Sequence, residues 1–436
     1  MLIAFSIKNW KSFRDEVSFT MEANKERNHS GTVAKFKKFR LNLLPVTGIF
    51  GPNASGKSNF VKALSFLQNL IVDPGRNFMS SEPYGFRLDP ATKSEPSKFA
   101  VDLVLQNSIY SYAILFNQKQ ILEEKLSFQN TRTEKILFER KAERLTVGEP
   151  LKKDVSEDAI KFLTPFLRKN YPSLNLLGAA NIDKVIPVFN WFSNSLKIIG
   201  SDSLFISRSE TEETSVGERL YGLGSGICSI KAVPFSEYLS QDMERLAGSI
   251  SKDSSLTIMD PKEGAIRISH AASAEIKVEK LFVLHKNCHG EEELFSFTDE
   301  SAGTKRLFNL INILDKSNPS DDSITFVIDD IDRSLHTKLT SSLIAQFLEG
   351  CDELSRKQLI FTAHDVQLID EDLLRRDEFW ICDRASDGAT TLYPVTDFKG
   401  LGAERDLQRS YLQGRFGGLP NLTVSCIRLK ESYLYD

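Results

Sequence analysis

The sequence lacks the features that define several common classes of protein. It contains no uninterrupted apolar run of about 18 residues, and Met1–Lys8 alternate as in a strand, so we predict neither a membrane-spanning helix nor a signal sequence. The five cysteines are scattered and show no CxxC spacing, which is typical of a reducing cytoplasm. We therefore expect a cytoplasmic protein without a membrane partner.

Excess charge and long helical repeats are also missing. The formal net charge of −4 gives no general attraction to nucleic acid, so any such contact would need a local basic patch. No heptads are sustained, which excludes a long coiled-coil arm. The 436 residues, of which 41% are hydrophobic and 26% charged, are typical of a globular protein with more than one domain.

The most informative stretch is Gly51–Ser58, which reads GPNASGKS and fits the phosphate-loop pattern G-x-x-x-x-G-K-[ST]. An apolar segment, Leu44–Phe50, precedes it and is predicted to be a buried strand. Phe60, Leu64 and Leu67 follow at helical spacing. A glycine-rich turn could match the pattern by chance, but the strand before and the helix after it favour a nucleotide-binding loop.

The chemistry of such a loop is phosphate binding. Its backbone N–H groups and the helix N-terminus attract phosphate oxygens, while Lys57 reaches the β- and γ-phosphates and Ser58 ligates Mg²⁺. We expect ATP to contact Asn53, Ala54, Ser55, Gly56, Lys57, Ser58 and Asn59.

Two further apolar segments end in candidate catalytic residues. Ile324–Ile328 precedes Asp329, which we expect to hold Mg²⁺, and Asp330, which we expect to orient the attacking water. An ordinary strand that ends in a turn acid is the alternative. Gln358–Ala363 ends at His364, and the helix predicted between the two strands suits a parallel crossover. His364 would then lie near the γ-phosphate.

A third element is the turn Asp299–Thr304 ahead of an amphipathic helix. A Ser-x-Gly turn at a helix N-terminus presents free N–H groups and a hydroxyl to an anion. Taken alone, this turn would be interpreted as a helix cap.

Together these motifs resemble, in content and order, the ABC-type ATPase head. The resemblance implies an α/β fold with a mixed central sheet and flanking helices, and heads that pair head to tail. Ser301 and Gly303 would contact the γ-phosphate of the ATP held by a partner chain, and Ser334–His336 would lie at the dimer seam. Asp330 stands where most relatives carry glutamate, so we expect slow hydrolysis. The glutamine of the family's Q-loop is not assigned.

The opening Phe5–Phe13, the Asp332–His336 segment and the tail Tyr411–Pro420 look like those of bacterial RloA-type ATPases. These are relatives of the OLD, RecF and SMC heads and include subunits of antiphage systems such as PARIS and Septu. The resemblance implies an ATPase that senses a phage protein or DNA. Because no room is left for a Toprim domain, we expect a separate effector, either a nuclease, a Toprim protein or a toxin. A RecF-like DNA repair ATPase is the alternative function.

The predicted organisation has four parts. Residues 1–135 form an N-terminal ATPase lobe with β-hairpins, 136–290 a mainly helical insertion, 291–399 a C-terminal ATPase lobe and 400–436 a tail. Strands are expected to return within the insertion at 265–269 and 279–284.

Two weaker patterns remain open. The basic run Lys35–Arg40 is interpreted either as a contact for phosphates or as a solvated strand edge kept from pairing by its lysines. His285, Cys288 and His289 resemble metal ligands, but a fourth ligand at suitable spacing is missing.

Overall fold

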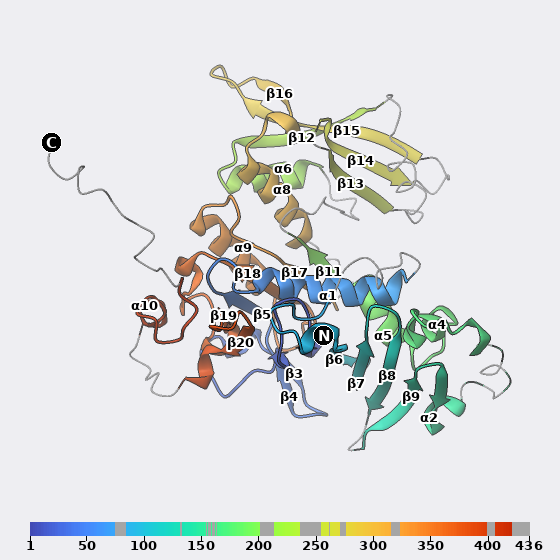
Figure 1. The fold of residues 1–436 in the computed structure, drawn as a ribbon. Helices are drawn as coiled ribbons and strands as arrows, with labels where there is room; N and C mark the ends of the chain where they lie inside the picture. Colours follow the sequence, from blue (N-terminus) through green and yellow to red (C-terminus); the bar gives the residue numbers. More distant parts are fainter. Residues whose placement is uncertain are drawn as a thin grey trace.

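The computed structural model describes residues 1–74, 84–130, 133–153, 155, 158, 162, 164–200, 213–235, 254–260, 262–270, 276–314, 323–398 and 406–420. Its elements form layers stacked around one central sheet (Figure 1). None of the helices in these ranges has the length and apolar character needed to cross a membrane.

The central sheet has six strands in the order β11-β17-β18-β5-β19-β20. Neighbouring strands from β11 to β19 run parallel, and β20 closes the edge antiparallel. All residues of β5, β17 and β18 are buried, as expected for parallel strands covered on both faces. The strands are β5 (Val46–Phe50), β11 (Leu196–Ile199), β17 (Thr325–Ile328), β18 (Gln358–Ala363), β19 (Phe379–Arg384) and β20 (Thr390–Pro394).

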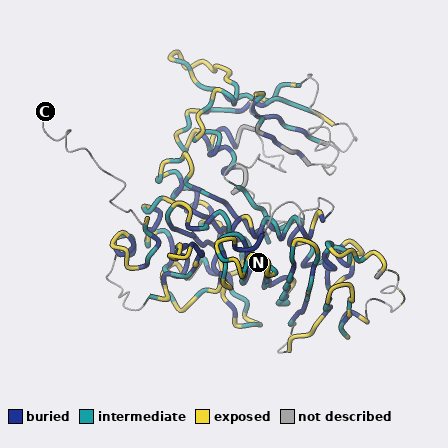
Figure 2. Tube along the Cα trace, viewed as in Figure 1, coloured by how far each residue is buried: buried dark blue, intermediate teal, exposed yellow. Residues whose placement is uncertain are grey.

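Alternate residues of these strands serve different cores, because successive side chains point to opposite faces of a sheet. In β18, Ile360 packs in the core that contains helix α1 (Lys57–Val72). Its neighbours Leu359 and Phe361 pack in the core that contains α8 (Ala302–Leu314) and α9 (Thr337–Glu349). In Figure 2, these central strands are coloured mainly as buried residues, in dark blue.

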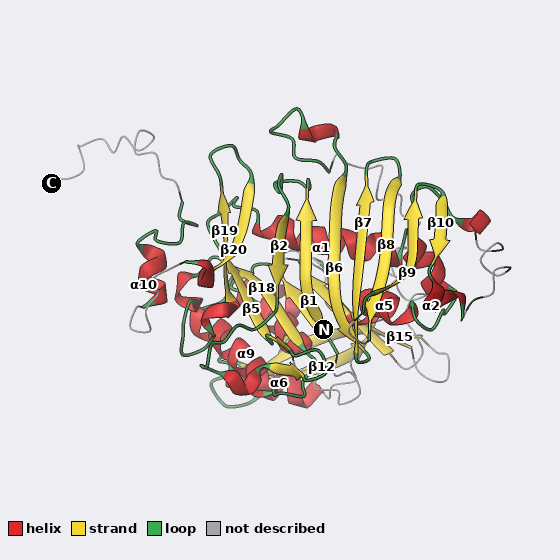
Figure 3. Ribbon diagram, turned by 90° about the horizontal axis from the view of Figure 1, so that it is seen from below, coloured by secondary structure: helices red, strands yellow, loops and turns green. Residues whose placement is uncertain are grey.

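Beyond α1 lies an antiparallel sheet of seven strands, β10-β9-β8-β7-β6-β1-β2, which Figure 3 shows edge to edge. The N-terminal strand and the β-hairpins predicted for residues 1–135 are confirmed here. The strands are β1 (Leu2–Lys8), β2 (Val17–Thr20), β6 (Ser97–Leu105), β7 (Ser108–Phe116), β8 (Ile121–Gln129), β9 (Lys135–Lys141) and β10 (Arg144–Val147). A short two-stranded sheet joins β3 (Ala34–Phe36) to β4 (Leu41–Leu43).

The prediction of a mainly helical insertion at 136–290 is correct only for the middle of that range. Residues 136–147 lie in β9 and β10, which continue the seven-stranded sheet across the expected boundary at 135. Helices follow as α2 (Glu149–Lys152), α4 (Ser173–Ala179) and α5 (Ile186–Asn190). A π-helical turn then leads into β11, a strand within the region expected to be mainly helical. In the stretch 158–168, which was also expected to be helical, residues 159–161 and 163 lie outside the described residues, and Thr164–Phe166 form a short 3-10 turn.

After α6 (Glu213–Gly222), the remainder of that region forms an antiparallel sheet, with strands β12-β15-β14-β13 in order and β16 paired to β15. One face of this sheet packs on α6 and α8, so its Leu281 and Val283 share a core with Leu307 and Ile311. The strands expected at 265–269 and 279–284 are confirmed as β14 and β15, whereas β12 and β13 form where a mainly helical insertion was expected. The strands are β12 (Ile227–Pro234), β13 (Ser254–Asp260), β14 (Gly264–His270), β15 (Ile276–Lys286) and β16 (Glu292–Ser296).

The α/β class with a mixed central sheet is therefore confirmed. In the described part of the chain the longest helix is α1, with 16 residues, so these residues contain no long coiled coil. A short helix, α10 (Leu407–Leu412), packs beside the last strands through Leu407 and Tyr411. The functional candidates follow the carboxyl ends of β5, β17 and β18, where parallel strands present their loops to one edge of the sheet.

Candidate active site

The loop between β5 and α1 curls so tightly that two of its positions have no room for a side chain. A Cβ on Gly51 would lie 2.1 Å from the backbone oxygen of Cys382, and one on Gly56 would lie 2.2 Å from Oγ1 of Thr390. Gly56 also has φ 117°, a backbone conformation that other residues rarely adopt. The two glycines thus let the loop form a cradle lined by its own backbone N–H groups.

Lys57 begins α1 and is almost fully buried within this cradle. Its Nζ donates to the backbone oxygens of Gly51, at 2.7 Å, and Pro52, at 3.0 Å, and lies 3.2 Å from Nδ1 of His364. Burial lowers the pKa of Lys57, and nearby carboxylates partly oppose this effect. An ammonium group held against the loop in this way is positioned to meet a phosphate that enters the cradle.

Asp329 and Ser58 meet at the end of β17. The Ser58 hydroxyl donates to Oδ1 of Asp329 over 3.2 Å, and the Thr362 hydroxyl donates to the same oxygen over 2.7 Å. Desolvation raises the pKa of Asp329, and these two hydrogen bonds counteract it. A hydroxyl beside a carboxylate is a pair of oxygen ligands of the kind that Mg²⁺ prefers.

Asp330 and His364 form the second polar pair. Nε2 of His364 lies 3.2 Å from Oδ1 of Asp330, and this contact is the main cause that lowers the Asp330 pKa. The backbone N–H of Asp330 donates to Thr362 Oγ1 over 2.8 Å, and the residue adopts φ 47°, in the left-handed region. Thr362 therefore links Asp329 to Asp330, and the strand end that carries them is held in one conformation.

The loop after the acidic pair is fixed by Asp332. Its Oδ2 accepts hydrogen bonds from the backbone N–H groups of His364, at 2.9 Å, and Asp365, at 2.7 Å. The side chains of Thr337 and Asp365 are also hydrogen-bonded. These contacts tie the end of β17 to the end of β18, which explains why His364 lies beside Asp330.

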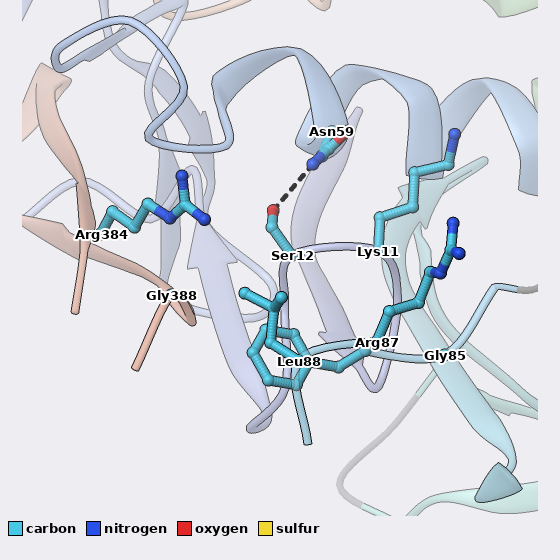
Figure 4. A pocket seen from close by; sticks show the side chains of 9 residues that line it. Lys11, Ser12, Asn59, Gly85, Arg87, Leu88, Arg384 and Gly388 are labelled. Carbon is cyan, nitrogen blue, oxygen red and sulfur yellow. Dashed lines mark hydrogen bonds between the residues drawn. The ribbon is translucent and has the colours of Figure 1, made fainter. Parts of the chain in front are cut away.

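A cavity of about 460 Å³ opens over the loop and is lined by Ser12, Asn53, Ala54, Ser55, Gly56, Lys57, Ser58, Asn59, His364 and Arg384. All seven loop residues expected to bind ATP line it, and His364 joins them. A second cavity of about 300 Å³, shown in Figure 4, shares Ser12, Asn59 and Arg384 with the first and adds the cations Lys11 and Arg87. The Asn59 side chain donates to Ser12 Oγ over 2.8 Å where the two cavities meet.

The Ser-x-Gly turn is not part of either cavity, since none of the residues lining them belongs to residues 299–304. The exposed Ser301 caps α8, because its Oγ accepts from the backbone N–H of Thr304 over 3.0 Å. Gly303 faces Ser334, whose backbone oxygen would lie 2.5 Å from a Cβ at that position. The structure thus places this turn against the Asp332–His336 segment of its own chain and apart from its own phosphate loop.

Several residues at the site were not identified from the sequence. Ser12, in a turn after β1, contacts Asn59, and Thr390, in β20, contacts the loop. Thr362 orients both aspartates, and Arg306 donates to their backbone oxygens. These residues come from four separate segments, and no motif assigned to ATP binding includes them. Arg306 alone had a local signal, because it follows the Ser-x-Gly turn on the same helix.

The two weaker patterns gain ordinary explanations. In the basic run, Lys35 forms an ion pair with Glu353, and Lys38 donates to the backbone oxygen of Asn107. His285 lies 2.8 Å from Oε1 of Glu300. Across the described residues, no cluster of histidine, cysteine or acidic side chains could hold a metal ion by itself.

A family model described as "AAA domain, putative AbiEii toxin, Type IV TA system" matches residues 46–370. The chain belongs to this family. The match begins with β5 and ends after β18, so it includes the phosphate loop, the Ser-x-Gly turn, the acidic pair and His364. This member of the AAA-domain family therefore contains a P-loop ATPase domain.

Solved structures that match include the SMC head domain from Thermotoga maritima, with 10% identity, a TM-score of 0.36, and coverage of 90% of this chain and 98% of that chain. Another is an SMC head bound to the C-terminal winged-helix domain of ScpA, with 13% identity, a TM-score of 0.37, and coverage of 90% and 97%. TM-scores this low carry no weight, and the fold rests on the strand order given above. No curated protein matches the chain.

Proposed function

We propose that the chain binds and hydrolyses ATP at sites shared between two copies arranged head to tail, and that this cycle controls a separate effector during antiphage defence. The observation that carries the ATPase part is the convergence of Lys57, Ser58, Asp329, Asp330 and His364 at one edge of the central sheet. Each of these side chains contacts at least one of the others.

The residues present fit ATP with Mg²⁺. Gly51 and Gly56 leave a cradle that a side chain would fill, and Ser58 with Asp329 supplies two oxygen ligands. These two residues would hold the ion, which when bound neutralises charge on the β- and γ-phosphates. Lys57 would leave its carbonyl partners for the phosphates, and the nucleoside would extend toward Lys11 and Arg384 in the adjoining cavity.

Asp330 and His364 would handle the attacking water. The lowered pKa keeps Asp330 ionised near neutral pH, so its carboxylate can accept a hydrogen bond from water and orient it. His364 is 40% exposed on the cavity side and would contact the γ-phosphate. Because the aspartate side chain is shorter than the glutamate of most ABC-type heads, we expect slow turnover.

The exposed Ser-x-Gly turn supports the head-to-tail arrangement. Ser301 and Gly303 open α8, whose first N–H groups form an anion site at a helix N-terminus, yet neither residue lines the cavities of its own chain. A second copy would bring this turn over the γ-phosphate. Ser334, Leu335 and His336, which adjoin Gly303, would then lie at the dimer seam.

The defence role is drawn from the family and from the resemblance to RloA-type ATPases. The family's description names a toxin and a toxin–antitoxin system. We propose a cytoplasmic complex in which a phage protein or DNA is the trigger and a nuclease, Toprim protein or toxin is the effector. The RecF-like alternative loses support, because Lys35 and Lys38 of the basic run already have partners within the chain.

The proposal is tested by purifying the tagged chain from its native host in ATP and Mg²⁺ and identifying bound proteins by mass spectrometry. A stoichiometric nuclease, Toprim protein or toxin is expected. Recovery of recombination proteins or DNA without an effector would favour the repair role instead. In the same host, Lys57→Ala should abolish protection against phage, and full protection by this variant would refute the dependence on ATP.

A further inference from the structure

Helix α8 carries the Ser-x-Gly turn at its start and, one turn later, an arginine that reaches the chain's own acidic pair. Arg306 is only 8% exposed, and its Nη2 donates to the backbone oxygen of Asp329 at 2.9 Å and of Asp330 at 3.2 Å. Arg306 thus holds the peptide units of both aspartates without touching the phosphate loop.

Because the Arg306 guanidinium is buried, moving it away from its present partners would be energetically costly. A buried charge is costly unless hydrogen bonds and opposite charges compensate it. The Arg306 guanidinium obtains both from one short loop, through the two backbone oxygens and the negative charges of Asp329, Asp330 and Asp332. A movement of α8 that carried Arg306 away would leave the charge uncompensated, so the loop and the helix are expected to move together.

A second contact joins the same two elements. Gly303 lies so close to Ser334 that a Cβ would meet its backbone oxygen at 2.5 Å, and Ser334 itself has φ 61°. On its other side the turn is anchored to β15, because Oε1 of Glu300 lies 2.8 Å from Nε2 of His285. The turn is therefore clamped between the five-stranded sheet and the catalytic loop.

We propose that Arg306 is a positioning residue that couples the Ser-x-Gly turn of a chain to the catalytic aspartates of the same chain. This inference rests on the proposed head-to-tail dimer. When the turn closes on the ATP of a partner copy, α8 shifts, and Arg306 transmits the shift to the carbonyls of Asp329 and Asp330. Each chain thereby adjusts its own hydrolysis to the occupancy of its partner's site, and the two sites of a dimer act cooperatively.

The test compares Arg306→Met with Arg306→Lys and with Lys305→Met in the full-length chain. Met removes the charge and the hydrogen bonds but keeps an unbranched apolar stem. Lys keeps the charge, but its ammonium nitrogen lies one bond closer to the backbone than Nη2 and is expected to reach the two oxygens less well. Lys305→Met removes a neighbouring charge on the same helix whose Nζ donates to the Thr298 oxygen, away from the aspartates. ATPase rates are measured against ATP concentration, with dimer formation followed in parallel.

For wild type we expect ATP-dependent dimers and a Hill coefficient above 1. Arg306→Met should still bind ATP and dimerise, but its kcat should fall about 10- to 100-fold, as expected for misplaced catalytic groups, and its Hill coefficient should approach 1. Arg306→Lys should recover part of both values, and Lys305→Met should match wild type. A merely structural role would lower the amount of folded protein and leave the Hill coefficient of the remainder unchanged.

The inference is overturned if Arg306→Met keeps the wild-type kcat and Hill coefficient, or if kcat falls while cooperativity is retained. Failure of the proposed function looks different, because the wild-type chain itself would then remain monomeric at saturating ATP. In that case both the proposed dimer and the coupling across it are refuted.

Discussion

Replacing Thr362 with valine is expected to weaken the site through one hydroxyl that serves both aspartates. Thr362 is fully buried, donates to Asp329 Oδ1 at 2.7 Å and accepts from the backbone N–H of Asp330 at 2.8 Å. Valine keeps the shape but leaves that N–H without its partner, which costs about 1–3 kcal/mol. Asp329 retains the hydrogen bond from Ser58, so we expect a total loss of about 2–3 kcal/mol in the free energy of unfolding.

The same change should alter nucleotide binding in a pH-dependent way. The hydrogen bond from Thr362 lowers the pKa of Asp329, so its removal raises that pKa and protonates more of the carboxyl at a given pH. Binding of ATP with Mg²⁺ should therefore weaken more in Thr362→Val than in wild type as the pH falls below neutral. Urea unfolding and titration with a fluorescent ATP analogue at several pH values measure the two effects.

A matched control is available in α9. Thr340 is also fully buried, but its hydroxyl finds no hydrogen-bond partner among the described residues. Thr340→Val should therefore leave stability unchanged or raise it, and should not affect nucleotide binding. If both valine variants lose the same stability and bind ATP alike, the bridging role of Thr362 is refuted.

Three further predictions follow from other contacts. Gly56→Ala should abolish ATP binding, because its Cβ would lie 2.2 Å from Oγ1 of Thr390. Gly222 has open space around it, so Gly222→Ala should bind ATP as the wild type does. Equal ATP affinities of the two variants would contradict the role of Gly56 in the cradle. Asp330→Glu should raise kcat, because a longer carboxylate reaches the water better, and an unchanged or lower rate would count against this role for Asp330. Burial raises the pKa of Glu378 from 4.5 to about 8, so the folded state binds its proton more tightly than the unfolded state does. The wild-type protein should therefore lose stability as the pH rises from about 5 to 8. Glu378→Gln should flatten this pH dependence in urea unfolding, and an unaltered dependence would argue against a protonated Glu378.

The parts of the site that were predicted from the sequence share a simple origin. Gly51–Ser58, Asp329 and His364 each follow a short apolar strand, and parallel strands bring their carboxyl ends to one edge of a sheet. Local pattern and chain order were therefore enough to bring these residues together. Their contacts in the structure, such as Lys57 with His364, agree with that reasoning.

The parts that were missed depend on contacts between distant segments. Thr362 is an interior residue of a buried strand, and nothing in its neighbourhood distinguishes a bridging hydroxyl from a packing one. The strand β11 contains only four residues after a helical stretch, so its pairing with β17 was invisible to periodicity. The strand β12 was missed because most of its residues are half-exposed or exposed, so buried and exposed positions alternate only weakly along it.

The measurement that tests the shared ATP site most directly is sedimentation of the chain with ATP and Mg²⁺. Asp330→Asn provides a background in which hydrolysis is slowed, and Lys57→Ala or Ser301→Arg is added to it. We predict an ATP-dependent dimer in the background, monomers with Lys57→Ala because ATP no longer binds, and monomers that still bind ATP with Ser301→Arg, since Ser301 acts on the partner's nucleotide. Dimers that persist with Ser301→Arg, or a background that stays monomeric at saturating ATP, would contradict the head-to-tail site.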